Sequence, residues 1–413
     1  MSGTVTGSLG DGGFAERAAR ADADDPLRAW LERFEPLPSD VVAYLDGNSL
    51  GRVAKGVNEA MVNFVGEQWG GRLIRGWDES WMNMPEALGD RIGAAALGAG
   101  AGQVIVGEST SVLLYKLARA ALDARPGRSC IVVDTDNFPT DRYLLEGIAE
   151  ERGCTLRWVQ TDPGAGLTPD QVATAVDGDV ALVVASHVSY RSAWIADAAA
   201  ITAIAHKAGA LVLWDVSHSV GSVPIRLDEW GVDLAAGCTY KYLNGGPGAP
   251  AFAYVRREHQ SALRQPIWGW LGSVDPFALG AGYEPSAGMR SVLSGTPHVL
   301  SMVALGVALG HLEEAGIEAV RRKSVALTSF ALELADAWLV PEGVAVASPR
   351  DPDRRGGHVT LRRPDFRAVN ERLWKLGVIP DFRYPDGIRI GLAPLSTSFA
   401  EVYRGLSALR AEL

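Results

Sequence analysis

The sequence lacks the features that mark disulfide-stabilised, membrane and nucleic-acid-binding proteins. Its cysteines, Cys130, Cys154 and Cys238, are odd in number and have no CxxC spacing, which argues against a disulfide framework or a zinc site. No apolar run approaches the roughly 20 residues that cross a bilayer. The net charge is −10 and basic residues do not cluster. We therefore expect no nucleic-acid or membrane partner and a cytoplasmic location.

Motifs for several other chemistries are missing as well. There is no GxxxxGK[ST] sequence, and the glycine-rich stretch 98–102 precedes a predicted strand, which is the wrong context for a nucleotide-binding loop. The histidines are scattered without HExxH spacing, so we expect no metal ion. No GxSxG sequence follows a strand, which disfavours a serine hydrolase.

What the sequence does contain is a regular alternation of segments from about residue 103. Short β-branched runs alternate with helical patterns, which is typical of βαβ units and a mostly parallel sheet. The runs at 180–186 and 210–215 are apolar throughout, as expected of central strands that are covered on both faces. We therefore predict an α/β fold.

The composition changes at both ends of this alternating region. Residues 1–24 are rich in Gly, Ala and Asp, which predicts a disordered or loosely docked arm. After about residue 299 a long helical segment leads into weaker strands, which predicts a smaller α+β domain. The predicted organisation is a segment that joins the small domain (25–50), a large domain (51–299) and the small C-terminal domain (300–413).

Asp215 and Lys241 are the most informative pair of residues. The acid ends an apolar run, and the lysine stands in a polar-aromatic loop before a glycine-rich turn. An enzyme that uses pyridoxal 5'-phosphate (PLP) needs such a pair, because a carboxylate keeps the ring nitrogen protonated and a lysine holds the aldehyde as a Schiff base. The pair fits equally well with a strand-end acid and a solvated loop lysine.

A hydroxyl-rich sequence stands ahead of an amphipathic helix at Ser109, Thr110 and Ser111. Hydroxyls and free backbone N–H groups at a helix N-terminus form an anion site, with the helix dipole favouring phosphate. Capping of the helix is the alternative, and it is the commoner role of such clusters.

More polar and aromatic residues follow predicted strands, at the carboxyl edge where α/β proteins bind ligands. Phe138, close to Asp141, can stack on a flat ring or can anchor its loop. The next strands lead into Ser186, His187, Tyr190 and Arg191, and then His218. A lone histidine such as His218 is more often structural than ligand-binding.

Other side chains have two interpretations each. Tyr240 adjoins Lys241, where its phenol could bind phosphate or move a proton. Trp268 and Trp270 could line a pocket, although most tryptophans lie in cores or interfaces. Arg389, in a predicted strand, could hold an α-carboxylate through two N–H groups, or it could be an exposed strand arginine.

Taken together, these motifs resemble those of the kynureninase family, particularly its bacterial members. The match is collinear and covers roughly residues 40 to 405. The matching segments are YLDGNSLG (44–51), NFPTD (137–141), SHVSYRS (186–192), WDVSHSVG (214–221), TYKYLNGGPG (239–248), SGTP (294–297) and VIPDFRYPDGIRIGLAPL (378–395). YLDGNSLG and YKYLNGGPG together separate this family from cysteine desulfurases and other relatives in the class V aminotransferase superfamily.

The resemblance implies a PLP-dependent transferase fold of type I, with a seven-stranded type of sheet, and a homodimer with shared active sites. It implies that Lys241 carries the Schiff base and that Asp215 is the partner of the ring nitrogen. The other implied cofactor contacts are Thr110, Ser111, Phe138, Asp141, Ser186, His218 and Tyr240, with Trp270 and Thr296 reaching in from the other subunit. On the substrate side, Arg389 matches the carboxylate-binding arginine, and Trp77 and Gly295 fall in segments that shape the aryl pocket.

The implied activity is hydrolysis of L-kynurenine, or of a 3-hydroxy or otherwise substituted kynurenine, to an anthranilate and L-alanine in tryptophan catabolism. The chain departs from the family pattern at Ser189, Ala193 and Ser273, where Asn, Gly and His are usual, and APLSTS replaces APLY. These departures leave open a related PLP enzyme that acts on another amino acid, as a C–S or C–C β-lyase or in an aminotransferase-like step. Retention of Asp215 and Lys241 argues against a non-enzymatic sensor or scaffold.

Overall fold

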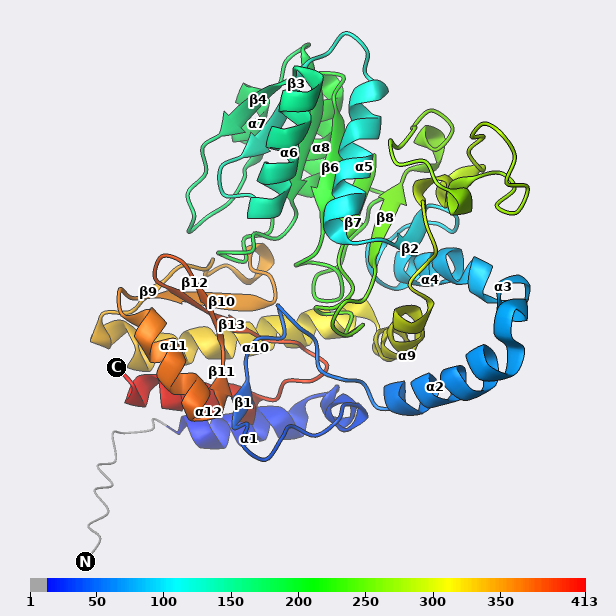
Figure 1. Cartoon of the computed structure of the whole chain (residues 1–413). Coiled ribbons are helices and arrows are strands. Elements are labelled where there is room, and N and C mark those ends of the chain that lie inside the picture. The colour runs from blue at the N-terminus through cyan, green and yellow to red at the C-terminus, as the bar shows by residue number, and fades with distance from the viewer. Residues whose placement is uncertain (1–12) are drawn as a thin grey trace, which may run out of the picture.

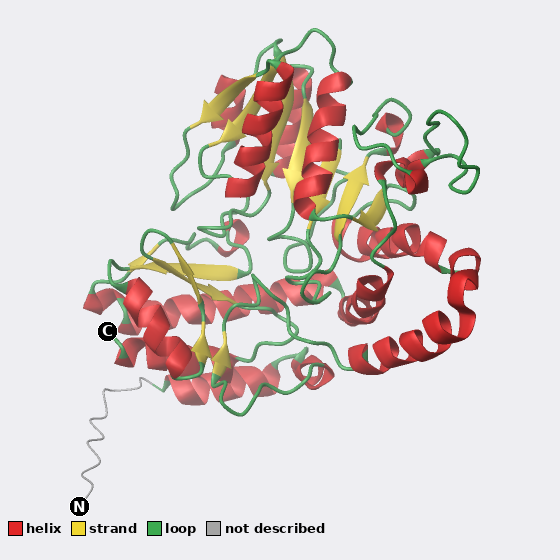
Figure 2. Ribbon diagram, viewed as in Figure 1, coloured by secondary structure: helices red, strands yellow, loops and turns green. Residues whose placement is uncertain are grey.

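The computed structural model describes residues 13–413, so the first half of the predicted N-terminal arm lies outside the described residues. A large α/β domain sits above a smaller domain that contains both ends of the described chain (Figure 1). In Figure 2 the helices flank the large sheet on both faces.

The large domain is built on a seven-stranded sheet in the order β2-β8-β7-β6-β5-β3-β4. Within this sheet β8 is the antiparallel strand. The strands are β2 Val104–Gly107, β3 Cys130–Asp134, β4 Thr155–Val159, β5 Val180–Ser186, β6 Leu211–Asp215, β7 Leu234–Gly237 and β8 Ala251–Val255. The α/β prediction is confirmed, and the carboxyl ends of the parallel strands all lie at the edge that faces the small domain (Figure 1).

Two apolar cores cover the two faces of this sheet. Because strand side chains alternate between faces, Val212 and Trp214 pack in one core, and Leu211 and Leu213 in the other. Helices α4, α7, α8 and α9 belong to the first core, and α5 and α6 to the second. Their bounds are α4 Met84–Ile92, α5 Thr110–Asp123, α6 Pro139–Arg152, α7 Pro169–Ala175, α8 Ala198–Lys207 and α9 Val299–Ala315. The helices α2 Val57–Asn63 and α3 Gly76–Glu79 form an arm beside this domain (Figure 1).

The small domain has a four-stranded antiparallel sheet in the order β12-β13-β10-β9 and a two-stranded pair, β1 with β11. Its strands are β1 Ala43–Tyr44, β9 Ala345–Val346, β10 His358–Arg362, β11 Val378–Ile379, β12 Asp381–Arg383 and β13 Gly387–Gly391. Its helices are α1 Phe14–Asp24, α10 Ile317–Trp338, α11 Phe366–Lys375 and α12 Phe399–Ala411. The pairing of β1 with β11 attaches the N-terminal segment to this domain.

Two details differ from the predicted boundaries. Residues 14–24, expected in a loose arm, form α1, which packs beside α12 and buries Ala18. Helix α9, placed in the small domain by the boundary at residue 300, buries Met302 and Leu309 in the core of the large domain. Among residues 13–413 no single helix is long and apolar enough to cross a membrane; α9 and α10 meet both conditions only as a pair, which is bent by 85°.

Candidate active site

Lys241 and His218 meet at the carboxyl edge of the sheet, in the loops that follow β7 and β6. Lys241 Nζ lies 2.9 Å from His218 Nε2. Burial, with the neighbouring Lys241 charge, lowers the pKa of His218 well below its usual value. The imidazole is therefore neutral, and its Nε2 can accept a hydrogen bond from the lysine. Its Nδ1 is buried and has no hydrogen-bond partner among residues 13–413.

Two buried carboxylates flank this lysine. Asp215 ends β6 beside Ser186 of β5, and its Oδ1 accepts a hydrogen bond of 2.8 Å from the Ser217 N–H. Asp141 lies in the first turn of α6, and its Oδ2 is buried without a partner. Burial and then the charge of Asp215 raise the pKa of Asp141 well above its ordinary range, while Lys241 opposes the shift. The cluster therefore contains two buried carboxyl groups, Asp215 and Asp141, and only the amine of Lys241 to balance their charge.

An aromatic and an amide complete this edge on the β3 and β5 side. Phe138 packs edge-on against Tyr190, with ring centroids 5.3 Å apart. Ser186 Oγ donates to Asn137 Oδ1 at 2.6 Å, and Asn137 Nδ2 is left without a partner. The sequence-based reasoning did not single out Asn137, although its place beside Phe138 in the NFPTD motif was an available signal.

Helix α5 begins at the same edge. The Ser109 side chain caps it by accepting from the Val112 N–H, so the predicted capping role is present. Thr110 and Ser111 occupy the first turn and are half-buried. Burial and the neighbouring Cys238 thiol raise the pKa of Tyr240, so its phenol stays protonated at neutral pH. Lys241 Nζ lies 6.0 Å from the centre of the Tyr240 ring.

Arg389 is buried at the join between the domains, and its guanidinium already has partners. Its Nε donates to Asp381 Oδ2 at 2.8 Å, and a second nitrogen also reaches this oxygen. Further bonds run to Ser49 Oγ at 3.0 Å and to the Tyr190 carbonyl at 2.8 Å. Asp381 was not predicted; its signal was the strand pairing, because it lies opposite Arg389 in β12 and β13.

The predicted rim at residues 186–191 is only partly correct. His187 does not face the other site residues; it packs against Trp214 and Trp230, where burial lowers its pKa to about 4. Arg191 Nε pairs with Asp136 at 2.7 Å. No group of three or more metal-ligating side chains is arranged to hold a metal ion within residues 13–413.

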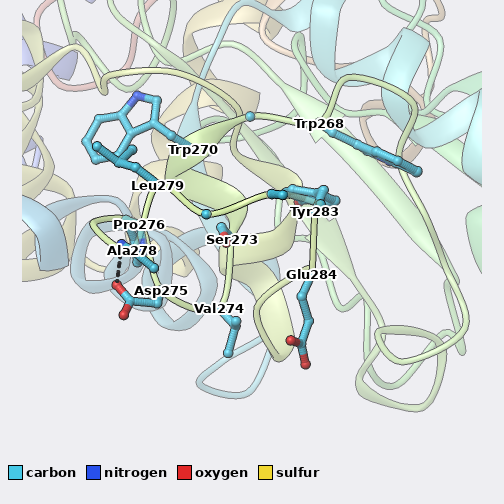
Figure 3. Close-up of a pocket in the computed structure, with 14 residues that line it drawn as sticks. Trp268, Trp270, Ser273, Val274, Asp275, Pro276, Ala278, Leu279, Tyr283 and Glu284 are labelled. Carbon is cyan, nitrogen blue, oxygen red and sulfur yellow. Dashed lines mark hydrogen bonds between the residues drawn. The ribbon is translucent and has the colours of Figure 1, made fainter.

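The tryptophans that were predicted for the site lie in a second region. Trp77 packs edge-on against Trp270, with ring centroids 6.3 Å apart. Thr296 lines a hollow of about 430 Å³ together with Trp77. A larger hollow of about 660 Å³ lies beside Trp270 and Ser273, with Trp268 over the Tyr283 ring (Figure 3).

This aromatic region is separate from the lysine cluster in the single chain. No hydrogen bond, ion pair or ring contact among the described residues joins Trp77, Trp270 or Thr296 to Lys241. Gly295 directly precedes Thr296, and a Cβ added at this glycine would meet no atom of the described residues within 4 Å.

Comparison with known proteins decides the family. The sequence profile of the kynureninase C-terminal domain matches residues 320–409. A kynureninase of Pseudomonas fluorescens is 39% identical over 395 residues, which are 94% of this chain and 92% of that protein. A kynureninase of Burkholderia pseudomallei (strain 1106a) is 38% identical over 96% of this chain and 94% of its own. The chain belongs to the kynureninase family.

Solved structures agree on the fold. A cysteine desulfurase from Thermococcus onnurineus NA1 superposes with a TM-score of 0.75 at 21% identity, over 92% of this chain and 96% of that one. The cystine C-S lyase C-DES, in complex with cysteine persulfide, superposes with a TM-score of 0.77 at 17% identity. The match covers 90% of this chain and 98% of that one. These likenesses confirm the predicted type I fold.

The structure also explains two departures from the kynureninase pattern. Ala193, where the family usually has Gly, has a φ of +65°, a left-handed conformation that favours glycine. Ser189 Oγ accepts from the N–H groups of Arg191 and Ser192 at 3.3 Å, a turn-closing role that an Asn side chain also performs. Ser189 therefore closes the loop after β5, whereas Ala193 holds a backbone conformation that is strained for a residue with a Cβ.

Proposed function

We propose that this kynureninase-family protein is a PLP-dependent hydrolase that cleaves L-kynurenine, or a ring-substituted kynurenine, into an anthranilate and L-alanine. The observation that carries the proposal is the cluster of Lys241, His218, Asp215 and Asp141 at the carboxyl edge of the sheet. Cytoplasmic tryptophan catabolism is the setting in which we place it.

The residues of this cluster fit PLP. Asp215 would hold the protonated ring nitrogen, which would also relieve the repulsion that Asp141 feels. Lys241 would bind the aldehyde, and Phe138 would stack on the ring. The remaining proposed contacts are the half-buried hydroxyls of Thr110 and Ser111 with the Tyr240 phenol at the phosphate, and Ser186 and His218 beside the ring. Bound PLP supplies an electron sink that makes the substrate Cα–H bond acidic.

The chain's own residues then handle binding and protons. The Lys241 amine would remove the proton at substrate Cα and return a proton later, and neutral His218 would accept a hydrogen bond from Lys241 and orient its Nζ. Tyr240, which stays protonated, can donate but cannot serve as a base at neutral pH. Overall, water adds to the γ-carbonyl of the substrate, and the Cβ–Cγ bond breaks to give the aromatic acid and alanine.

Arg389 would bind the substrate α-carboxylate. Because Asp381 already accepts from two of its nitrogens and the Tyr190 carbonyl from the third, the incoming carboxylate would displace Ser49 and use the second N–H of Nη1. Trp77 and Gly295 would border the aryl ring.

A homodimer with shared sites accounts for the separate aromatic region. Trp270 and Thr296 have no contact with Lys241 of their own chain, while several apolar side chains nearby are solvent-exposed, including Trp268 at 65% and Leu279 at 82%. Two copies that pair through this face would place Trp270 and Thr296 in each other's PLP sites.

The activity is tested with purified protein, PLP and L-kynurenine or 3-hydroxykynurenine, by measuring alanine and the matching anthranilate. Alanine released in equal amount to the anthranilate supports the proposal. Turnover of an S-substituted cysteine without turnover of either kynurenine would instead indicate a β-lyase and contradict it.

The shared site is tested by mixing two inactive variants, Lys241→Ala and Trp270→Ala, after separate purification and subunit exchange. If Trp270 serves the partner's site, each mixed dimer contains one intact site, and about a quarter of wild-type activity returns at equal mixing. If Trp270 serves its own chain's site, no mixed dimer has an intact site and activity stays at the level of the separate variants.

A further inference from the structure

Lys116 is a fully buried cation that the proposed chemistry does not use. It lies in the second turn of α5, and its side chain has no solvent exposure. Its Nζ donates to Glu108 Oε1 at 2.7 Å, to Ser294 Oγ at 2.7 Å and to the Val292 carbonyl at 3.0 Å. All three protons of the ammonium group are therefore used. Glu108 and Ser294 lie in loops, and Val292 ends the short 3-10 helix Gly288–Val292.

Ser294 joins the two segments that carry the residues proposed to reach the partner's site, Trp270 and Thr296. Ser294 Oγ also donates to the Ile267 carbonyl, and the Ser294 carbonyl accepts from the Leu271 N–H at 3.2 Å. A Cβ on Gly269 would lie only 2.3 Å from this carbonyl oxygen. The backbone at Gly269 therefore packs directly against the backbone at Ser294. Ser294 thus fixes the position of Trp270 on one side and of Thr296 on the other.

The other loop starts the proposed phosphate cradle of the chain's own site. Glu108 has a φ of +55°, a conformation that a non-glycine residue holds only when its surroundings impose it. Its carboxylate pairs with Lys116, and its carbonyl accepts from the Ala251 N–H at 3.0 Å. The turn at Glu108 sets where Ser109 caps α5 and where Thr110 presents its hydroxyl.

We propose that Lys116 is a positioning residue that couples the phosphate cradle of its own site to the loop that completes the partner's site. The inference rests on the proposed function, because it assumes PLP in that cradle. The buried ammonium of Lys116 then positions the phosphate cradle of its own site and the loop that contacts the phosphate in the partner's site. Its loss should therefore weaken PLP binding more than it lowers the stability of the fold.

The experiment compares PLP affinity and thermal stability in three variants of the full-length dimer. Lys116→Met removes the charge and replaces the lysine with an unbranched side chain of similar length. Ser294→Ala keeps the ion pair and removes the bond to the loop. Lys323→Met is the matched control, because Lys323 is equally buried and pairs with Asp25 at 2.8 Å in the small domain, away from the cradle. PLP is removed from each protein and titrated back, and its dissociation constant is read from the visible absorbance.

We expect the PLP dissociation constant to rise about tenfold in Lys116→Met and less in Ser294→Ala, and to stay near wild type in Lys323→Met even though that variant also melts at a lower temperature. Equal affinities in all three variants would overturn the proposal, as would an equal weakening in Lys323→Met. If Lys116→Met does not fold, unchanged affinity in Ser294→Ala decides against it. Failure of wild-type protein to bind PLP would contradict the proposed function itself, a result that differs from all of these.

Discussion

The two edges of the central sheet differ in whether their buried polar groups have hydrogen-bond partners. At the amino edge, Asp233 is almost fully buried and has three partners, His206 at 2.8 Å, His259 at 2.7 Å and the Val212 N–H at 2.8 Å. Although burial raises its pKa, these hydrogen bonds hold the pKa of Asp233 at about 2. This carboxylate is stabilised by its surroundings, as expected for a structural residue.

The carboxyl edge has unsatisfied groups and strain instead. Buried atoms of Asn137, Asp141 and His218 have no partner within the described residues. Three of the non-glycine residues with positive φ, Glu108, Ala193 and Asn244, stand in loops that follow β2, β5 and β7. Strain and unpaired polar atoms often occur where a ligand completes the structure, so the difference supports our proposal that PLP binds at this edge.

The largest effect should come from Lys241→Ala, which removes the proposed attachment point and proton carrier of the carboxyl edge. Activity should fall by at least about a thousandfold, while the protein still folds because Lys241 lies outside the apolar cores. The measurement is turnover together with the mass of the chain after borohydride treatment with PLP. A PLP-labelled chain in this variant would show that another lysine is the attachment point.

Asp215→Asn should keep PLP bound but lower kcat by about a hundredfold or more, since a neutral amide cannot hold the proton of the ring nitrogen. Steady-state kinetics and the visible spectrum are measured together. Asp233→Asn, at the opposite edge of the same sheet, is the matched control and should retain wild-type kcat. Equal kcat in the two variants would remove the functional distinction between the edges.

Arg389→Lys tests the substrate side. Lysine offers a point charge without the two-pronged geometry of the guanidinium, so kcat/KM should fall by about ten- to a hundredfold while the resting spectrum stays unchanged. Arg383→Lys is the control, because Arg383 contacts the same Asp381 at 3.0 Å but is more exposed. Unaltered kinetics with the true substrate would rule out Arg389 as the carboxylate ligand.

The two buried aspartates should give opposite dependences of stability on pH in the PLP-free protein. The folded pKa of Asp233, about 2, lies below its unfolded value, so this group stabilises the protein above about pH 4 and the contribution of about 2 kcal/mol is lost as the pH falls toward 2. Asp233→Asn should remove that stability at pH 7.

Asp141 has a raised folded pKa, so the stability of the PLP-free protein should fall as the pH rises from about 4 through that folded value. Asp141→Asn should therefore stabilise the PLP-free protein at pH 7. Urea unfolding of wild type and both variants between pH 2 and 8 measures the signs, with the Asp233 effect between pH 2 and 4 and the Asp141 effect above pH 4. Destabilisation by Asp141→Asn at pH 7 would show that the burial of Asp141 and its repulsion by Asp215 do not destabilise the PLP-free protein.

The smallest expected effect is at Ala193. Ala193→Gly should raise the free energy of unfolding by up to about 1 kcal/mol, because relief of the left-handed strain exceeds the extra chain entropy of glycine in the unfolded state. Denaturant unfolding measures it. A loss of stability would mean that the loop after β5 is not strained at this position.

The sequence by itself determined the α/β class, the strand-end position of Asp215, the loop position of Lys241 and the family resemblance. Hydrophobic alternation and turn residues are local signals, so they can be read along the chain. It also identified Ala193 as unusual, although only the φ angle explained why glycine is preferred there.

Only the tertiary structure decided which side chains meet. His218 contacts Lys241, Asp381 occupies Arg389, and Lys116 joins Glu108 to Ser294, a residue 178 positions away in sequence. It also turned His187 into the core, docked α1 beside α12 and separated Trp77 and Trp270 from the lysine cluster. Such contacts arise because folding brings loops from different strands to one sheet edge, and no local pattern in the sequence records the distance between them.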